Sequence, residues 1–140
     1  MKSRPARKVT LGVALAGLLA APSVAAAAPS VSVELNKLEA ADKDCRATLV
    51  VKNGKDTAFS ELRLDLVVFD GDSVVAKRLI VDVAPLAAKK TSVKSFDIAG
   101  LGCDGISRLL LNDVPACGGD ADCLGLVETS SRAKKTPFDK

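Results

Sequence analysis

Short stretches in which hydrophobic and polar residues alternate follow one another along most of the chain. The alternation is clearest over residues 62–68, where leucine occupies three successive second positions and valine the fourth. The same period of two marks residues 31–36 and 45–52. This period is typical of a β-strand buried on one face, whereas a helix needs apolar residues at i, i+3 and i+4. No stretch after residue 28 keeps the helical spacing. The pattern therefore predicts a chain of strands.

Turn residues divide the chain into separate strands. Residues 53–56 and 70–73 are rich in Asn, Asp, Gly and Ser, which favour turns, and Pro85 ends the fourth strand. The expected strands cover residues 31–36, 45–52, 62–69, 74–83, 91–98, 106–114 and 124–127. Lys77 and Arg78 lie inside the fourth, which is therefore expected at a sheet edge, where charges discourage pairing with other chains. The spacing predicts one all-β domain, an immunoglobulin-like antiparallel β-sandwich of about seven strands.

The first 27 residues have the parts of a secretory signal peptide. Four basic residues precede an apolar run over 9–21, and small residues over 24–28 offer a cleavage site near Ala26 or Ala27. The apolar run is shorter than the roughly 20 residues that span a bilayer. We therefore predict a cleavable signal peptide and no stable membrane insertion after cleavage.

Removal of the signal peptide changes the charge balance. The whole chain has a formal net charge of +3, with 20 basic and 17 acidic residues. Four basic residues and no acidic ones precede residue 28, which leaves 20 − 4 = 16 basic against 17 acidic residues. Because the remaining charges alternate in sign and no basic patch with aromatic residues forms, nucleic acid is excluded as a partner. The sandwich is expected over 28–130 and a flexible basic tail over 131–140, either solvated or in contact with anionic lipid headgroups.

Cysteine usage predicts two disulfide bonds. Cys45, Cys103, Cys117 and Cys123 all follow the signal peptide, and export favours disulfides. A zinc site would want closer pairs such as C-x₂-C. Cys117 and Cys123 flank a short glycine-rich loop and are expected to pair. Cys45 and Cys103 precede the second and sixth strands, which run in the same direction if successive strands alternate, so these two cysteines are expected to meet at one end of the domain.

Residues 45–98 resemble an immunoglobulin-like module of bacterial envelope proteins, the FxLyD type. The segments that carry this resemblance are 50–53, 62–68, 69–75 and 85–96. The chain is also similar to a group of small exported proteins of alphaproteobacteria that are labelled by a twin-arginine signal, through residues 31–38, 112–114 and 123–127. The resemblance implies a sandwich fold and an exported location, and it brings no catalytic residues. The adjacent arginine pair of a twin-arginine signal is missing from residues 3–8.

Several short polar pairs are candidates for chemistry: Ser92/Lys94, Ser107/Arg108, Asp70/Asp72 and Asp120/Asp122. The chain contains no histidine that could serve as a base, so the serine pairs are interpreted as solvent-facing strand residues. The aspartate pairs are interpreted as turn residues, because a calcium loop needs more oxygen ligands than they offer. Asn112 and Asp113 end the sixth strand and either cap a corner or face a partner. We therefore expect no catalytic, metal-binding or cofactor-binding residues.

The expected function is that of a soluble, non-catalytic periplasmic protein. A sheet edge or the disulfide-bound loops would bind another envelope protein, because pairing along a strand edge requires no special side chains. The alternative is a carrier of a small ligand or lipid, with a pocket between the sheets. The aromatic content of 3% weighs against the carrier, because ligand pockets are commonly lined with aromatic side chains.

Overall fold

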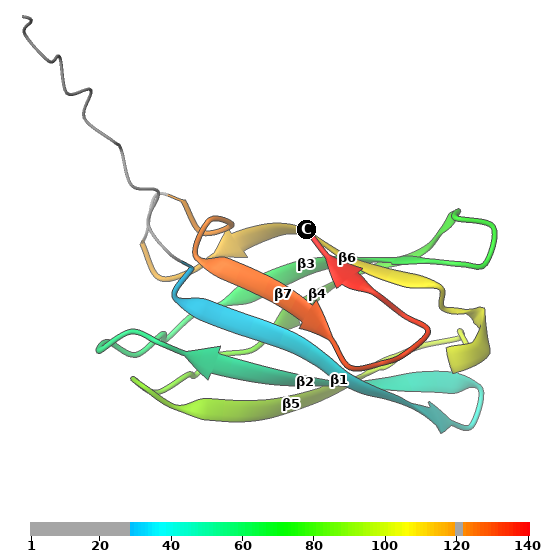
Figure 1. The fold of residues 1–140 in the computed structure, drawn as a ribbon, viewed down its shortest axis with the longest axis horizontal. Helices are drawn as coiled ribbons and strands as arrows, with labels where there is room; N and C mark the ends of the chain where they lie inside the picture. The colour runs from blue at the N-terminus through cyan, green and yellow to red at the C-terminus, as the bar shows by residue number, and fades with distance from the viewer. Residues whose placement is uncertain (1–28, 120–121) are drawn as a thin grey trace, which may run out of the picture.

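The computed structural model describes residues 29–119 and 122–140, and the predicted signal peptide lies outside these ranges. Eight strands form two sheets of four strands that pack face to face (Figure 1), which confirms the predicted all-β sandwich. The strands are β1 (Val31–Ala41), β2 (Asp44–Asn53), β3 (Arg63–Phe69), β4 (Val75–Asp82), β5 (Thr91–Ile98), β6 (Arg108–Ala116), β7 (Val127–Ser131) and β8 (Phe138–Asp139). A single 3₁₀ turn, η1 (Cys103–Gly105), precedes β6. Among the described residues, no helix has the length and hydrophobicity needed to cross a membrane.

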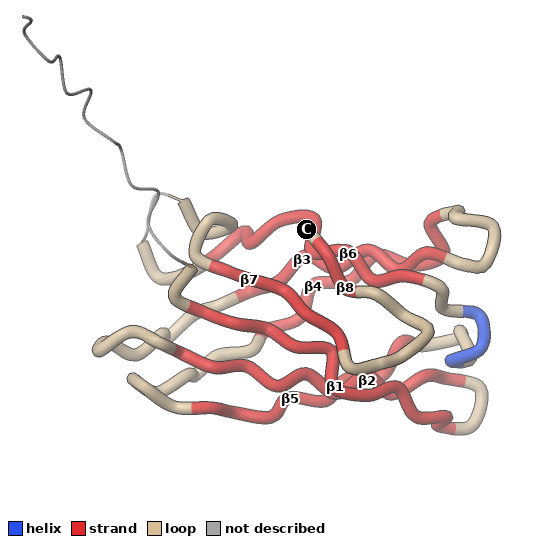
Figure 2. The backbone as a smooth tube through the Cα atoms, in the orientation of Figure 1, coloured by secondary structure: helices blue, strands red, loops and turns tan. Residues whose placement is uncertain are grey.

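The chain changes sheets repeatedly as it builds the sandwich. One sheet has the order β5-β2-β1-β7 and the other has the order β4-β3-β6-β8. The neighbours in the order β1-β2-β5 and β4-β3-β6 pair antiparallel, as the corresponding strands of the immunoglobulin fold do. The last two strands are different, because β7 runs parallel to β1 and β8 runs parallel to β6. Loops and turns gather at the two ends of the sandwich (Figure 2).

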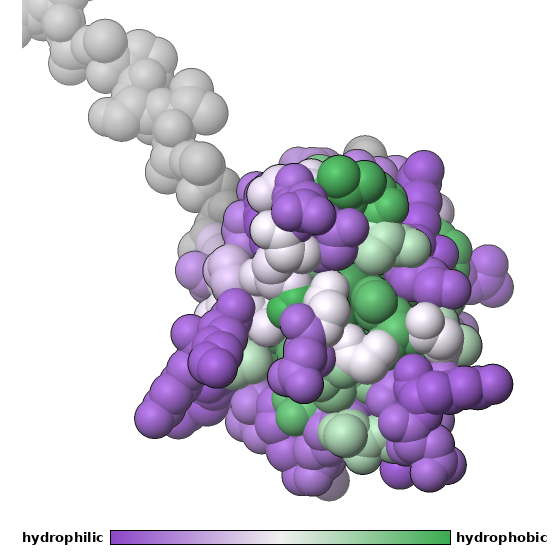
Figure 3. Space-filling model, turned by 90° about the vertical axis from the view of Figure 1, so that its right-hand side faces the viewer, coloured by the Kyte–Doolittle hydropathy of each residue, from purple (hydrophilic) through white to green (hydrophobic). Residues whose placement is uncertain are grey.

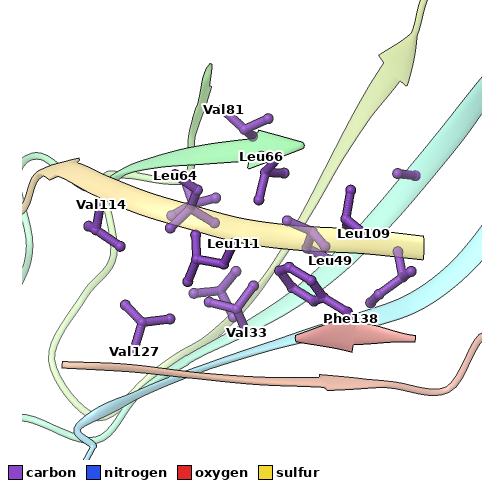
Figure 4. Close-up of a cluster of buried hydrophobic side chains, with 14 of the residues drawn as sticks. Val33, Leu49, Leu64, Leu66, Val81, Leu109, Leu111, Val114, Val127 and Phe138 are labelled. Carbon is purple, nitrogen blue, oxygen red and sulfur yellow. The ribbon is translucent and has the colours of Figure 1, made fainter. Parts of the chain in front are cut away.

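The core lies between the two sheets and is made by the alternating hydrophobic residues. Leu64, Leu66 and Val68 of β3 are fully buried, and so are Leu35 and Leu49 of the opposite sheet. Figure 4 shows side chains from β3 and β6 on one side of the core and from β1 and β7 on the other. Because each strand turns every second residue inward, the period of two in the sequence becomes the packing of this core.

Both disulfide bonds join the predicted pairs. Cys45, at the start of β2, is bonded to Cys103 of η1, with 4.8 Å between their Cα atoms. Cys117 is bonded to Cys123 across the β6–β7 connection, with a Cα–Cα distance of 5.7 Å. Cys45 points into the core, as its place in the alternation of β2 predicts. The first bond therefore ties one end of β2 to the segment that follows β5.

The last ten residues belong to the fold, so the predicted flexible tail over 131–140 is wrong. Thr136 and Phe138 are only 4% and 5% exposed. The backbone N–H of Leu109 donates to the oxygen of Pro137 at 3.0 Å, and Phe138 enters the core between the sheets (Figure 4). A two-residue strand is too short to produce an alternating pattern, and the basic residues before it dominate the composition of the segment.

The seventh strand also lies further along the chain than predicted. Residues 124–126 form a turn, and β7 begins at Val127 rather than at residue 124. Val127 is the only fully buried residue of β7, and the four residues after it are polar and at most partly buried. A strand with one core residue carries no alternating signal, and the apolar run before it drew the prediction toward the turn.

Candidate functional site

The two long sides of the sandwich are built differently. On one side, β7 of the first sheet and β8 of the second lie in contact, and Val127 and Phe138 bring both strands into the core; we call this the closed side. On the other side, β4 and β5 are the outermost strands of their sheets and have eight residues each; we call this the open side. The open side presents the longer backbone edges, so it is the candidate functional site.

The strand β5 has a regular edge. Its register with β2 is continuous from the first residue to the last. Just beyond the strand, the N–H of Asn53 donates to the oxygen of Lys90 at 2.8 Å. Because hydrogen-bonded and non-bonded positions alternate in an antiparallel pair, every second residue of β5 directs its N–H and C=O away from β2. These residues are Thr91, Val93, Ser95 and Asp97.

The edge of β4 is shorter and irregular. A shift in its register with β3 lies between Val68 and Phe69 and places an extra residue in β4. The N–H of Val83 donates to the oxygen of Leu62 at 2.9 Å, which fixes the alternation along the rest of the strand. By that alternation, the backbone groups that point outward are those of Arg78, Ile80 and Asp82. A bulge of this kind twists an edge and limits its use in pairing.

Each edge strand carries a lysine on the face that it turns toward the core. Lys77 of β4 lies opposite the buried Val68, and Lys94 of β5 lies opposite the buried Leu49. Residues directly opposite each other in a ladder share one face of the sheet. A charged residue on the inner face of an edge strand disfavours pairing between two copies of a sheet, because it would be buried. The open side is therefore protected against indiscriminate pairing without being covered.

An ion pair lies on the outer face at the end of β5. Arg46 of β2 donates from Nε to Oδ1 of Asp97 at 2.8 Å and from Nη2 to Oδ2 at 3.0 Å. The hydrogen bonds from Arg46 lower the pKa of Asp97, and those to Asp97 raise the pKa of Arg46. The pair fixes the end of the edge strand to its neighbour, while Val93, in the middle of β5, remains 64% exposed.

A buried carboxylate connects β3, β4 and β6. Asp65 of β3 is 3% exposed and accepts from Nε of Arg78 at 2.9 Å and from Nη2 at 2.6 Å. Asn112 donates from Nδ2 to Oδ2 of Asp65 at 2.8 Å. The hydrogen bonds from Arg78 lower the pKa of Asp65, and those from Asn112 add to the effect, although burial opposes it. The sequence pattern does not reveal the burial of Asp65, because a single polar residue inside an alternating strand gives no signal of burial.

The sequence left two interpretations of Asn112 and Asp113 open. Asn112 binds Asp65, and Oδ1 of Asp113 accepts the N–H of Val114 at 2.8 Å. Both residues lie where the register between β3 and β6 shifts. Both lie inside β6, which continues to Ala116, so they do not end the strand as expected; their hydrogen bonds are made within the fold.

The two edge strands line a shallow hollow at one end of the open side. Lys77, Arg78 and Leu79 contribute from β4, and Asp97, Ile98 and Ala99 contribute from the end of β5. The hollow has a volume of about 220 Å³. It suits the side chains of an added strand better than a separate small molecule, because ligand pockets are usually 300–1,000 Å³.

The serine pairs are half-buried, so their interpretation as solvent-facing strand residues is wrong. Ser92 and Lys94 occupy neighbouring inner-face positions of β5. The hydroxyl of Ser107 donates to the backbone oxygens of Phe69 and Asp70. Arg108 is bound to Asp139, with Nη2 2.8 Å from Oδ2. Ser107 and Arg108 therefore serve to fasten loops and β8.

The described aspartates of the two aspartate pairs belong to turn regions. Oδ1 of Asp70 accepts the backbone N–H groups of Asp72 and Val74, both at 2.9 Å. Oδ1 of Asp122 accepts the N–H of Gly125 at 2.9 Å, while Asp120 lies outside the described residues. In the ranges that the structure describes, no three His, Cys, Asp or Glu side chains gather in a way that could hold a metal ion.

No known family model, no curated protein and no solved structure matches the chain. The resemblance to the FxLyD-type module and to the exported alphaproteobacterial group stays a prediction from the sequence.

Proposed function

We propose that the protein is an exported, non-catalytic interaction module of the bacterial envelope that binds a second envelope protein along β5. The single observation that carries this proposal is the regular, eight-residue edge of β5 on the open side. The signal-like leader and the two disulfide bonds support an oxidising, exported location such as the periplasm.

The geometry of β5 suits the addition of a strand from a partner. The four outward-directed residues of β5 offer alternating donors and acceptors to a backbone laid beside them. Val93 is exposed between Thr91 and Ser95, so it offers an apolar contact to a side chain of the added strand. Main-chain bonds supply affinity in this mode of recognition, and contacts such as the one at Val93 supply selectivity.

Proline substitution tests the proposal, because proline removes the N–H that an added strand would use. Val93→Pro removes an outward N–H of β5. Ile80→Pro is the matched control, since Ile80 is also an outward position in the middle of an edge strand and its side chain is 56% exposed against 64% for Val93. Complexes would be cross-linked in living cells, purified through a tag and identified by mass spectrometry.

We expect Val93→Pro to lose the cross-linked partner and Ile80→Pro to keep it. Thermal melting of both purified variants would show that each is folded. A partner that survives Val93→Pro, or that both variants lose equally, would contradict binding along β5. Loss on replacement of Cys117 and Cys123 alone would assign binding to the disulfide-bound loop instead.

The alternative of a carrier with its pocket between the two sheets has no observation in its favour among the described residues. The space between the sheets is occupied by packed leucine, valine, isoleucine and phenylalanine side chains (Figure 4). The hollows that involve β4, β5 and the loops lie at the surface rather than between the sheets.

A further inference from the structure

A second surface feature lies at the end of the sandwich, away from the middle of the open edge. A hollow of about 380 Å³ is lined by residues 36–38, Cys103 and residues 132–136; we call it the basic hollow. It joins three segments that are distant in sequence: the second half of β1, η1 and the β7–β8 connection. Figure 3 faces this end of the molecule, where hydrophobic and neutral residues gather in the middle and hydrophilic side chains project around them.

The fold holds the rim of the basic hollow in place. The N–H of Arg132 donates to the oxygen of Leu35 at 2.9 Å, next to the register shift in β1. The N–H of Thr136 donates to the oxygen of Ala133 at 2.9 Å, which closes a turn. The hydroxyl of Ser131 accepts the N–H of Ala133 and donates to the oxygen of Thr136. Lys134 and Lys135 therefore occupy the two central positions of an ordered turn.

The charges that line the basic hollow are all positive. Lys37 is paired with Glu39 at 2.9 Å, and Arg132 is paired with Glu34 at 3.0 Å. Lys134 and Lys135 are in none of the ion pairs found among the described residues, and both are exposed. No acidic side chain belongs to the lining. With two of the four cations matched by glutamates, the hollow has an excess of two positive charges.

The floor of the basic hollow is apolar. Leu38 and Ala133 are half-buried and pack against the core, and Cys103 beside them is engaged in its disulfide bond. An excess of positive charge next to an apolar floor suits a ligand that has an anionic group and a hydrocarbon part. Lysine binds phosphate as a point charge, so the two adjacent lysines suit a phosphate group.

We propose that the basic hollow binds the phosphate group of an anionic amphiphile, with the phosphate at Lys134 and Lys135 and the hydrocarbon part over Leu38. The site would take single molecules rather than a flat membrane. Asp42 lies with Lys43 in the β1–β2 turn, Asp44 begins β2, and Asp104 lies in η1 at the same end of the sandwich. These carboxylates would be repelled by the surface of an anionic bilayer.

Binding can be followed residue by residue in the purified protein with its disulfides intact. The probes are dihexanoyl phosphatidylglycerol below its micelle concentration, its zwitterionic phosphatidylcholine counterpart, and inorganic phosphate. Amide chemical shifts in ¹⁵N–¹H correlation spectra would be recorded during each titration. We expect the phosphatidylglycerol to shift the amides of residues 36–38 and 132–136, and the phosphatidylcholine to bind at least about tenfold more weakly because it has no net charge.

A second adjacent lysine pair provides the matched control. Lys89 and Lys90 lie at a turn directly before β5, and Lys89 is paired with Asp56 at 3.5 Å. The opposite end of β5 pairs with Cys45, which lies near the basic hollow. We expect Lys134→Gln/Lys135→Gln to weaken binding of the phosphatidylglycerol by about tenfold or more, and Lys89→Gln/Lys90→Gln to leave it unchanged. Shifts that spread over both ends, or an equal loss in the two double variants, would show general charge attraction and overturn the site.

Titrations with inorganic phosphate and with lipid vesicles identify the source of the phosphate. If inorganic phosphate binds as tightly as the lipid at the same amides, the site recognises free phosphate, and the amphiphile part of the proposal is wrong. Binding to phosphatidylglycerol vesicles without any response to the monomeric lipid would replace the proposal by a membrane contact. Absence of shifts at residues 132–136 with every probe would refute it altogether.

Discussion

The closed and open sides of this sandwich differ in how their outermost strands are protected. On the closed side, the chain crosses from β7 to β8 and places Val127 and Phe138 in the core. On the open side, β4 and β5 end their sheets as bare edges, and each carries an inward-facing lysine, Lys77 or Lys94. Coverage stabilises an edge, whereas charge only protects it from pairing. The difference leaves β5 available to a partner.

Removal of the two disulfide bonds should give the largest difference in stability loss between the sides. Cys45–Cys103 closes a separation of 58 residues beside β5, whereas Cys117–Cys123 closes only 6 residues between β6 and β7. In the chain-entropy account, these loops correspond to about 4 and about 2 kcal/mol of stability. Urea unfolding of the two double Cys→Ala variants should therefore show the greater loss for Cys45/Cys103. Equal losses of unfolding free energy in the two variants would contradict the expectation that Cys45–Cys103 stabilises the fold more than Cys117–Cys123.

The phenylalanines of the two sides form the next comparison. Phe138 of the closed side is 5% exposed, whereas Phe96 of β5 is only half-buried. We expect Phe138→Ala to lower the free energy of unfolding by about 3 kcal/mol, and Phe96→Ala by about 1 kcal/mol. Chemical denaturation of both variants under one condition measures the difference. A smaller loss for Phe138 than for Phe96 would mean that β8 adds little to the closed side.

The carboxylate of Asp65 should make stability depend on pH. Asp65→Asn removes charge-assisted hydrogen bonds to Arg78 and Asn112, so we expect a loss of about 1.5 kcal/mol at neutral pH. Since folding lowers the pKa of Asp65 below 3.8, the native state binds protons less readily than the unfolded state. The stabilisation is therefore fully present above pH 3.8 and is lost as the pH falls through the lowered value.

Denaturation midpoints at neutral and acidic pH check this sign. The difference in unfolding free energy between the wild type and Asp65→Asn should become smaller below pH 3.8. Asp97→Asn is the control at the exposed pair with Arg46, and a smaller loss is expected there because solvent screens exposed charges. A gap for Asp65→Asn that stays constant down to low pH would assign its effect to packing.

Replacement of the inward-facing lysines should have the smallest effect on stability, and it tests the open edge most directly. Lys77→Val/Lys94→Val should leave the unfolding free energy within about 1 kcal/mol but allow copies of the protein to pair edge to edge. Sedimentation velocity at increasing concentration would detect this association. Lys52→Val is the control, since Lys52 lies on β2, which has a neighbour on both sides. A monomeric double variant would show that these lysines do not protect the edge.

Local pattern was enough to predict most of the fold. The alternation over 62–68 became the buried face of β3, residues 91–98 match β5, and Lys77 and Arg78 correctly indicated an edge strand. The disulfide pairs followed from strand direction and loop length. These predictions succeeded because each depends on spacing within one strand or on the simple order of strands.

The features that set the candidate sites depend on contacts between distant segments. The burial of Asp65 requires Arg78 from the next strand and Asn112 from β6, and neither neighbour is visible in the local pattern of β3. The outward backbone of β5 is an open edge because β7 pairs with β1 at the far end of the sheet and no described strand pairs with the outer side of β5.

The amino-acid sequence by itself determined that this protein is a β-sandwich with two disulfide bonds, because hydrophobic period and cysteine spacing are local properties. The tertiary structure decided the rest. It turned the expected tail over 131–140 into the rim of the basic hollow and the strand β8, because a single buried phenylalanine, Phe138, finds its place only in a core that the whole chain has assembled.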